Sequence, residues 1–232
     1  MEPARLVLFD LDGTLIDSET GIVASTEYAL AKLGAAIPPR AVLRTWIGPP
    51  LRATFPTVLG DDPQVIERAV ALYRERFADV GWREHAVYPG IAQTVDALVV
   101  GGATLAVVTS KPDLYAGRIV ASLPFGHRFD RVYSVHAGSA HSEKAEMIAE
   151  ALADFAIAPQ HAVMIGDRHF DIAGARANGV RGIGAAWGFG SVDELNAAGA
   201  HAIAHAPQEL LALIAPSRAF SAPATPAAAA VP

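Results

Sequence analysis

Short apolar runs recur along the chain, and few polar side chains interrupt them. The clearest four span residues 6–9, 104–108, 162–165 and 181–185, and a weaker one spans residues 131–135. Strands with one face in water alternate between apolar and polar residues, whereas strands of a parallel sheet covered on both faces do not. The runs therefore predict the strands of a buried parallel sheet.

Stretches with helical periodicity separate these runs. They span residues 91–100, 142–155 and 171–178, and Gly179 follows the last of them, where a glycine commonly ends a helix. Strands that alternate with helices in this way predict an α/β fold, in which helices cover a parallel sheet.

The connection after the first strand is much longer than a strand–helix–strand unit, which needs only about 30 residues in total. It contains two helical patterns, at residues 18–33 and 63–80, and Asp62 and Pro63 form a typical start for the second. We therefore expect residues 16–86 to form an all-helical cap domain, and residues 1–15 and 87–215 to form the core. The Ala/Pro-rich residues 216–232 are predicted to be a disordered tail.

Polar side chains follow the first three strands at the point where each strand ends. They are Asp10 and Asp12, then Thr109, Ser110 and Lys111, and finally Asp167 and Asp171. The carboxyl ends of parallel strands meet at one edge of a sheet, so these side chains should lie close together. Each group alone could be an ordinary turn or helix cap. Three such groups together indicate a functional site.

Converging aspartates need a partner. Two carboxylates 4 Å apart repel each other by about 4 kcal/mol at an effective dielectric constant near 20. Either protonation or a cation must relieve this repulsion, and oxygen ligands favour Mg²⁺, with Ca²⁺ as the chemical alternative. Lys144 lies in the first turn of a predicted helix, where the dipole disfavours a cation. It is either a surface lysine or the partner of a bound phosphate.

Composition limits the function classes. The net charge of −6 argues against a nucleic acid polymer or an anionic membrane as partner. The chain has no cysteine, which excludes thiol catalysis and cysteine-bound metals and suits a cytoplasmic protein. Residues 1–9 lack the apolar stretch of a signal peptide, and the apolar region 95–108 is too short to span a bilayer.

Four motifs together resemble those of the haloacid dehalogenase superfamily. In chain order they are Asp10-x-Asp12-Gly-Thr, the strand ending at Thr109, Lys144, and Gly-Asp167-x-x-x-Asp171, with an insertion after the first. The resemblance covers residues 5–214 and implies a Rossmann-like core with a helical C1-type cap. Residues 48–51, 144–148 and 187–190 are similar to those of phosphoglycolate phosphatase-like and bacterial 5′-nucleotidase-like members.

This resemblance implies a role for each motif residue. Asp10 would be the nucleophile that forms an aspartyl-phosphate, and Asp12 would act first as general acid and then as general base. Mg²⁺ would bind Asp10, the backbone carbonyl of Asp12, and Asp167, with Asp171 behind them or acting through water. The phosphoryl oxygens would be held by Thr109, the Ser110 backbone amide and Lys144.

The predicted function is Mg²⁺-dependent hydrolysis of a small phosphate monoester, such as phosphoglycolate or a nucleoside 5′-monophosphate. In the cap, Arg44, Gly48, Pro49 and Arg52 are candidates for substrate selection, although Arg44 and Arg52 fit a solvated helix face equally well. A sugar-phosphate mutase would use the same core residues, and a non-catalytic binding protein is a further alternative. The sequence leaves the oligomeric state open.

Overall fold

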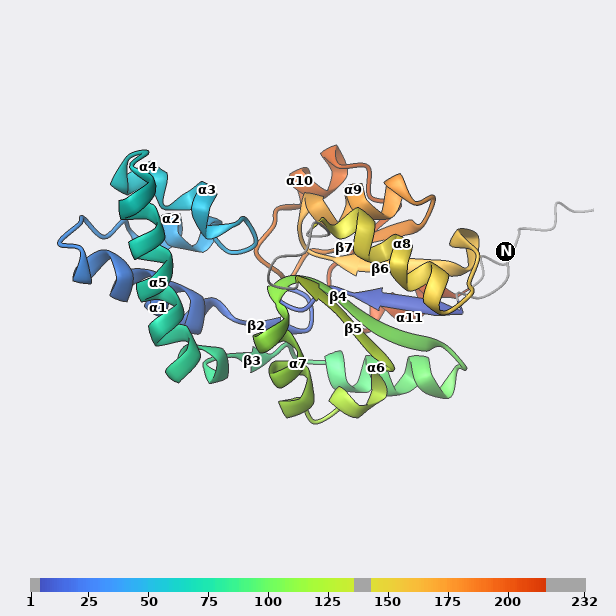
Figure 1. Cartoon of the computed structure of the whole chain (residues 1–232). Coiled ribbons are helices and arrows are strands. Elements are labelled where there is room, and N and C mark those ends of the chain that lie inside the picture. Colours follow the sequence, from blue (N-terminus) through green and yellow to red (C-terminus); the bar gives the residue numbers. More distant parts are fainter. Residues whose placement is uncertain (1–4, 136–142, 216–232) are drawn as a thin grey trace, which may run out of the picture.

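The computed structural model describes residues 5–135 and 143–215. Within these ranges, six parallel strands form one sheet in the order β5-β4-β1-β6-β7-β8 (Figure 1). The strands are β1 (Leu6–Phe9), β4 (Thr104–Pro112), β5 (Arg131–Val135), β6 (Ala162–Gly166), β7 (Arg181–Ala185) and β8 (Ala202–Ala204). This sheet confirms the predicted α/β class and all five predicted strands.

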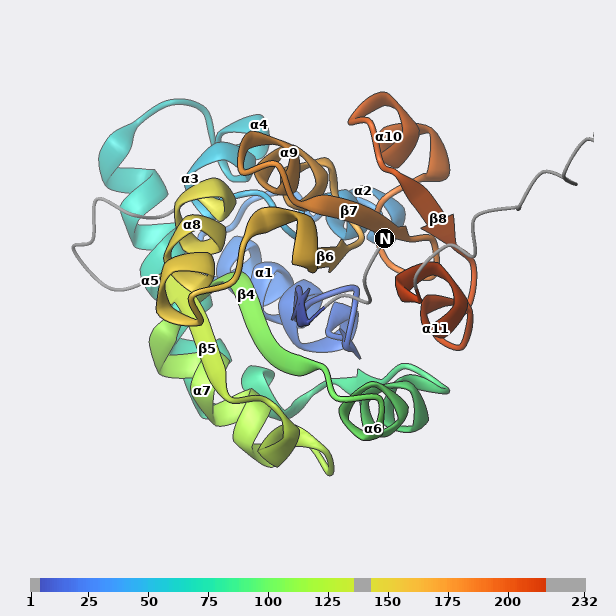
Figure 2. The same ribbon diagram turned by 90° about the vertical axis from the view of Figure 1, so that its right-hand side faces the viewer.

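Helices cover both faces of the sheet (Figures 1 and 2). One face carries α6 (Ile91–Val100), α7 (Asp113–Ser122) and α11 (Glu209–Ile214), and the other carries α8 (Lys144–Asp154), α9 (His169–Ala177) and α10 (Val192–Ala197). Successive side chains of β1 point to opposite faces. Phe9 packs in the same core cluster as Ile91, and Leu8 packs in the cluster that contains Met147. Both faces are therefore apolar, which explains the unbroken runs.

The structure differs from the sequence predictions at several element ends. The strand predicted to end at residue 108 continues as β4 to Pro112, with a shift in its register against β5 between Val108 and Pro112. β8 was not predicted, because three residues are too few to stand out as an apolar run. Gly179 has a positive φ of 67°, which confirms its role after helix α9.

The segment between β1 and β4 is largely helical. It contains α1 (Glu19–Lys32), α2 (Arg40–Thr45), α3 (Leu51–Thr54), α4 (Pro56–Leu59) and α5 (Pro63–Asp79), followed by a 3₁₀ turn, Gly81–Arg83. Asp62 caps α5 as predicted, because its Oδ1 accepts a hydrogen bond of 2.8 Å from the Gln64 backbone N–H. Figure 1 shows these helices as a group at one end of the sheet.

Two short strands connect the helical segment to the sheet. They are β2 (Ile16–Asp17) and β3 (Ala86–Val87), which pair antiparallel with each other. The division into a core and a cap with bounds at 16 and 86 stays a prediction, and the residues expected to form a tail lie outside the described ranges. Across those ranges, the helices lack the combination of length and hydropathy needed to cross a membrane.

Candidate active site

The turn after β1 places Asp10 against the loop after β6. Asp10 directly follows the strand, and its backbone N–H donates a 2.8 Å hydrogen bond to the Ile165 carbonyl. Gly13 has a φ of +85°, and a Cβ atom at this position would overlap the carboxylate of Asp167. Glycine is therefore required at residue 13 for two reasons, its backbone conformation and this close approach.

We expect Gly13→Ala to weaken Mg²⁺ binding, because the added methyl group displaces Asp167. Gly102→Ala is the matched control, since Gly102 has a φ of +84° and no atom within 4 Å of the position of an added Cβ. Both variants should lose about 1–3 kcal/mol of folding free energy from the strained φ. Mg²⁺ titration by calorimetry should then show weaker binding for Gly13→Ala alone. Equal affinity in the two variants would contradict this interpretation of the turn.

Three buried carboxylates meet at the ends of β1 and β6. One oxygen each of Asp10, Asp167 and Asp171 lies within 4.8 Å of the others. Oδ2 of Asp167 accepts a 2.7 Å hydrogen bond from the Phe189 backbone N–H, and Oδ2 of Asp171 accepts one of 3.1 Å from the Arg168 backbone N–H. The sequence predicts that Asp10, Asp12 and Asp167 converge. Asp10 and Asp167 do so, together with Asp171, whereas the carboxylate of Asp12 contacts Lys111 instead.

The cluster fits a hard divalent cation. Oδ1 of Asp167 is fully buried and has no hydrogen-bond partner among the described residues. Buried polar atoms nearly always have a partner, so this oxygen is suited to a ligand. A set of carboxylate oxygens without histidine or cysteine is the type of site that Mg²⁺ prefers. Both oxygens of Asp171 already contact protein donors, Oδ1 the Lys144 ammonium and Oδ2 the Arg168 N–H, which suits the predicted place of Asp171 behind the other two.

Lys144 binds two of these carboxylates from the start of α8. Its Nζ atom lies 2.6 Å from Oδ1 of Asp10 and 2.7 Å from Oδ1 of Asp171, and it donates a 2.7 Å hydrogen bond to the Val108 carbonyl. The side chain is 6% exposed. The unfavourable position of a lysine in the first helical turn is thus offset by protein carboxylates. Contact between Lys144 and a bound phosphate stays a prediction.

Burial and mutual repulsion favour protonation of the acidic cluster. Burial raises the pKa of Asp10 to about 7, and Asp171 adds to the increase, while Lys144 opposes it. Burial also raises the pKa of Asp167 well above its usual value, and the charges of Asp10 and Asp171 raise it further. For Lys144, burial lowers the pKa, but the two aspartates outweigh it and the net change is upward. Without a metal, the ammonium group of Lys144 contacts two of the three carboxylates.

We expect stabilisation by Mg²⁺ to increase with pH. The folded-state pKa of Asp10 lies near 7, above its ordinary value of 3.8, so protonation of Asp10 favours the folded state. That contribution is complete below the ordinary value and is lost as pH rises through about 7. Mg²⁺ competes with the proton, and thermal unfolding should therefore show a larger rise in Tm upon Mg²⁺ addition at pH 8 than at pH 5. A rise in Tm that is the same at both pH values would contradict the assignment.

The end of β4 forms the opposite side of the site. Thr109 is buried, and its Oγ1 accepts a 3.2 Å hydrogen bond from the Lys111 backbone N–H, whereas Ser110 is exposed. The Nζ atom of Lys111 donates 2.8 Å hydrogen bonds to both carboxylate oxygens of Asp12. Lys111 belongs to the polar group predicted at the end of this strand, but no role follows for it from the sequence.

A loop after β7 also contacts the acidic cluster. Besides the Phe189 backbone donor, the Trp187 indole N–H donates a 3.0 Å hydrogen bond to the Thr14 carbonyl. A Cβ atom at Gly188 or Gly190 would overlap the backbone or side chain of Asp167. Residues 187–190 were noted from the sequence only as a family resemblance. Their contact with the Asp167 carboxylate depends on tertiary packing, which leaves no pattern in the local sequence.

Two of the cap candidates lie against these core loops. Arg44 donates a 3.2 Å hydrogen bond to the Gly188 carbonyl, and its guanidinium carbon lies 5.5 Å from the centre of the Phe189 ring. The neighbouring Gly48 approaches Arg168, whose guanidinium donates to the Ile47 carbonyl.

Arg52 instead forms a bidentate ion pair with Glu67 on α5, and both side chains are exposed. Pro49 is half-buried. Substrate contact by any of these four residues stays a prediction.

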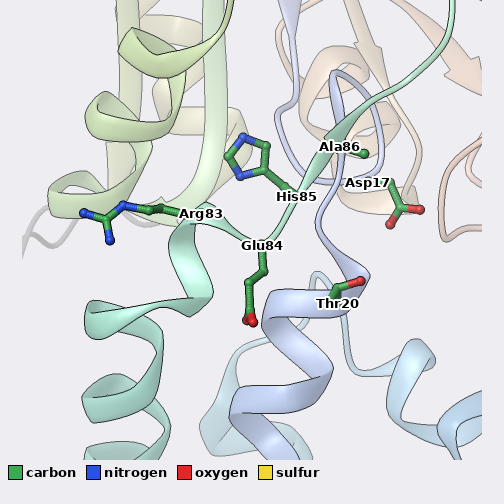
Figure 3. A pocket seen from close by; sticks show the side chains of 6 residues that line it. All are labelled: Asp17, Thr20, Arg83, Glu84, His85 and Ala86. Atoms are coloured by element: carbon green, nitrogen blue, oxygen red, sulfur yellow. The ribbon is translucent and has the colours of Figure 1, made fainter.

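A pocket of about 330 Å³ lies where the helical segment joins the core. Figure 3 shows Asp17 of β2 and Thr20 of α1 beside the segment that leads into and begins β3, which carries the other lining residues. The lining residues are Asp17, Thr20, Arg83, Glu84, His85 and Ala86. This hinge pocket does not include the acidic cluster.

The chain is similar to a known enzyme family and to several of its members. Residues 7–185 match the haloacid dehalogenase-like hydrolase family. A 5′-nucleotidase of Pseudomonas aeruginosa is 42% identical over 207 residues, covering 89% of this chain and 92% of that protein. Phosphoglycolate phosphatase 1 of the same species is 30% identical over 197 residues, covering 80% of this chain and 70% of that protein.

A solved structure extends the similarity to the whole fold. Protein tyrosine kinase A (PtkA) of Mycobacterium tuberculosis is 32% identical, with a TM-score of 0.79, and the match covers 92% of this chain and 99% of that chain. The family match and the two phosphatase relatives confirm the prediction of a phosphatase-type hydrolase. From its motifs, its fold and these similarities, the chain belongs to the haloacid dehalogenase-like hydrolase family.

Proposed function

We propose that this protein is a Mg²⁺-dependent phosphatase that hydrolyses small phosphate monoesters through an aspartyl-phosphate at Asp10. The observation that carries the proposal is the position of Asp10, which lies at the carboxyl end of β1 beside Asp167 and Asp171 and contacts Lys144. Lys144 holds one oxygen of Asp10 at 2.6 Å, which orients the carboxylate. An oriented carboxylate next to a cation site is suited to nucleophilic attack on phosphorus.

The reaction proceeds in two steps. Asp10 attacks the phosphorus while the bond to the leaving oxygen breaks, and Asp12, which carries a proton at this stage, gives that proton to the leaving oxygen. Asp12, now ionised, takes a proton from water as the water oxygen attacks the aspartyl-phosphate, which releases inorganic phosphate and restores Asp10. Asp10, the backbone carbonyl of Asp12, and Asp167 would hold the Mg²⁺ ion, with Asp171 behind them or acting through water. Thr109, the Ser110 amide and Lys144 would hold the phosphoryl oxygens. Bound Mg²⁺ would supply the positive charge that brings an anionic phosphate to an anionic carboxylate.

A nucleoside 5′-monophosphate is the favoured substrate class, and phosphoglycolate is the second. The similarity to a 5′-nucleotidase over most of both chains supports this order. Arg44, which lies against the loop that binds Asp167, is the better placed of the two cap arginines to contact a substrate. We also place the enzyme in the cytoplasm, which suits a chain without cysteine.

A substrate panel tests the proposal. Inorganic phosphate release should be measured from nucleoside 5′-monophosphates, phosphoglycolate, sugar phosphates and p-nitrophenyl phosphate, with Mg²⁺ or with a chelator. We expect turnover with Mg²⁺ only, and the highest kcat/KM for a nucleotide. Dependence on a bisphosphate activator without net phosphate release would instead identify a mutase. Phosphorylation of a protein acceptor by a nucleoside triphosphate without hydrolysis would also contradict the proposal.

A further inference from the structure

Lys111 forms a second buried lysine–aspartate pair, separate from that of Lys144. Its Nζ atom is 2.8 Å from each carboxylate oxygen of Asp12. The side chain of Lys111 is 5% exposed and that of Asp12 is 14% exposed, so little water competes for the contact. Lys144 contacts Asp10 and Asp171 instead. The two aspartates at the end of β1 are thus held by different lysines.

The helical segment closes off the other side of this ammonium group. The ring centre of Phe77, on α5, lies 4.9 Å from Nζ of Lys111, which is within the range of a cation–π contact. Phe77 is itself fixed between Tyr73, whose ring stacks on it at 5.5 Å, and Tyr115 on α7, which meets it edge to face at 5.0 Å. The ammonium group therefore has an aromatic ring on one side and the Asp12 carboxylate on another. This packing restricts the orientations of both charged side chains.

We propose that Lys111 is a positioning residue that orients the Asp12 carboxylate for its two proton transfers. The inference rests on the proposed function, because it requires Asp12 to be the proton donor. Asp12 lies in a loop, and its carboxylate could otherwise rotate about two side-chain torsions. Contact of one ammonium group with both oxygens fixes the direction in which the carboxylate points. Proton transfer requires such alignment, since it occurs only within hydrogen-bond reach of the reacting oxygen.

Leaving-group dependence distinguishes positioning from a general structural role. An alkyl phosphate needs a proton on its leaving oxygen, whereas the p-nitrophenolate ion leaves readily without one. In Lys111→Met, kcat/KM should fall at least about tenfold further for an alkyl phosphate than for p-nitrophenyl phosphate. Lys32→Met, at an exposed lysine on α1, is the matched control and should behave as wild type for both substrates. Lys111→Arg keeps the charge and should recover part of the loss.

A double-mutant cycle with Asp12→Asn gives the second readout. If Lys111 acts through Asp12, adding Lys111→Met to Asp12→Asn should lower kcat/KM no further. The proposal would be contradicted if Lys111→Met lowered kcat/KM equally for both leaving groups and if the two substitutions lowered kcat/KM independently, so that their factors multiply in the double variant. An increase in KM confined to substrates with a second anionic group would also contradict it and assign Lys111 to substrate binding. If Lys111→Met does not fold, Lys111→Gln is assessed in the same way.

The same data separate the inference from the proposed function. Loss of activity in Asp12→Asn together with wild-type kinetics in Lys111→Met would overturn only the role of Lys111. Full activity in Asp12→Asn, or an inactive wild type, would overturn the proposed function on which it depends.

Discussion

Asp10→Asn is expected to lower kcat by about 10⁴-fold or more, because an amide cannot act as the nucleophile. The variant should nevertheless fold, since asparagine has nearly the same shape as aspartate. In the absence of Mg²⁺ its Tm should equal or exceed that of wild type at pH 8, because one of three repelling carboxylates becomes neutral. Phosphate release and thermal unfolding, measured on the same preparation, test both parts.

Asp96→Asn is the matched control for this substitution. Asp96 is an exposed residue of α6 that pairs with Arg128, away from the acidic cluster. This variant should keep wild-type stability, since exposed ion pairs contribute little to it. It should also keep wild-type activity, because Asp96 is not part of the candidate active site. An Asp10→Asn variant with more than a small fraction of the activity of Asp96→Asn would exclude Asp10 as the nucleophile.

Lys144→Met is expected to cause the largest loss of stability and to abolish turnover. Removing one partner from a buried ion network leaves the other charges uncompensated, which costs about 3–5 kcal/mol. Lys144 contacts Asp10 and Asp171 in an almost fully buried setting, so the effect should be strongest where both are ionised. Urea unfolding at pH 8 without Mg²⁺ measures the free energy of unfolding directly.

Added Mg²⁺ should recover part of this loss, because the cation replaces the missing positive charge, whereas activity should not return. Lys32→Met serves as the control and should unfold as wild type. If Lys144→Met were as stable as Lys32→Met in metal-free buffer, the proposed electrostatic role of Lys144 would be wrong.

The sheet could be predicted because its residues follow a simple rule. Leu6–Phe9 is buried on both faces, and its unbroken apolar sequence indicates this burial. The short β8 and the extension of β4 to Pro112 could not be predicted, because three residues or a polar strand end carry no such signal. For β4, the pairing of Pro112 with Val135 lies beyond a register shift, so the strand continues past the polar residues 109–111.

The candidate site was predictable to the extent that topology determines it. Asp10 and Asp167 follow neighbouring parallel strands, so their proximity required only the α/β fold. The lysines that pair with the aspartates were harder to predict from the sequence. The position of Lys144 in a first helical turn indicated a need for negative charge, but not that Asp10 and Asp171 would provide it. The contact between Lys111 and Asp12 depends on how two loops and α5 pack, which no local pattern specifies.

The most direct test of the central claim is a rapid acid quench of wild-type enzyme with Mg²⁺ and a substrate labelled on its phosphoryl group. The account predicts acid-stable label on the protein in the first turnover, located at Asp10 by mass spectrometry after reductive trapping of the acyl-phosphate, and no label in Asp10→Asn. Phosphate release without labelled protein, or label on another residue, would contradict the assignment of Asp10 as the nucleophile.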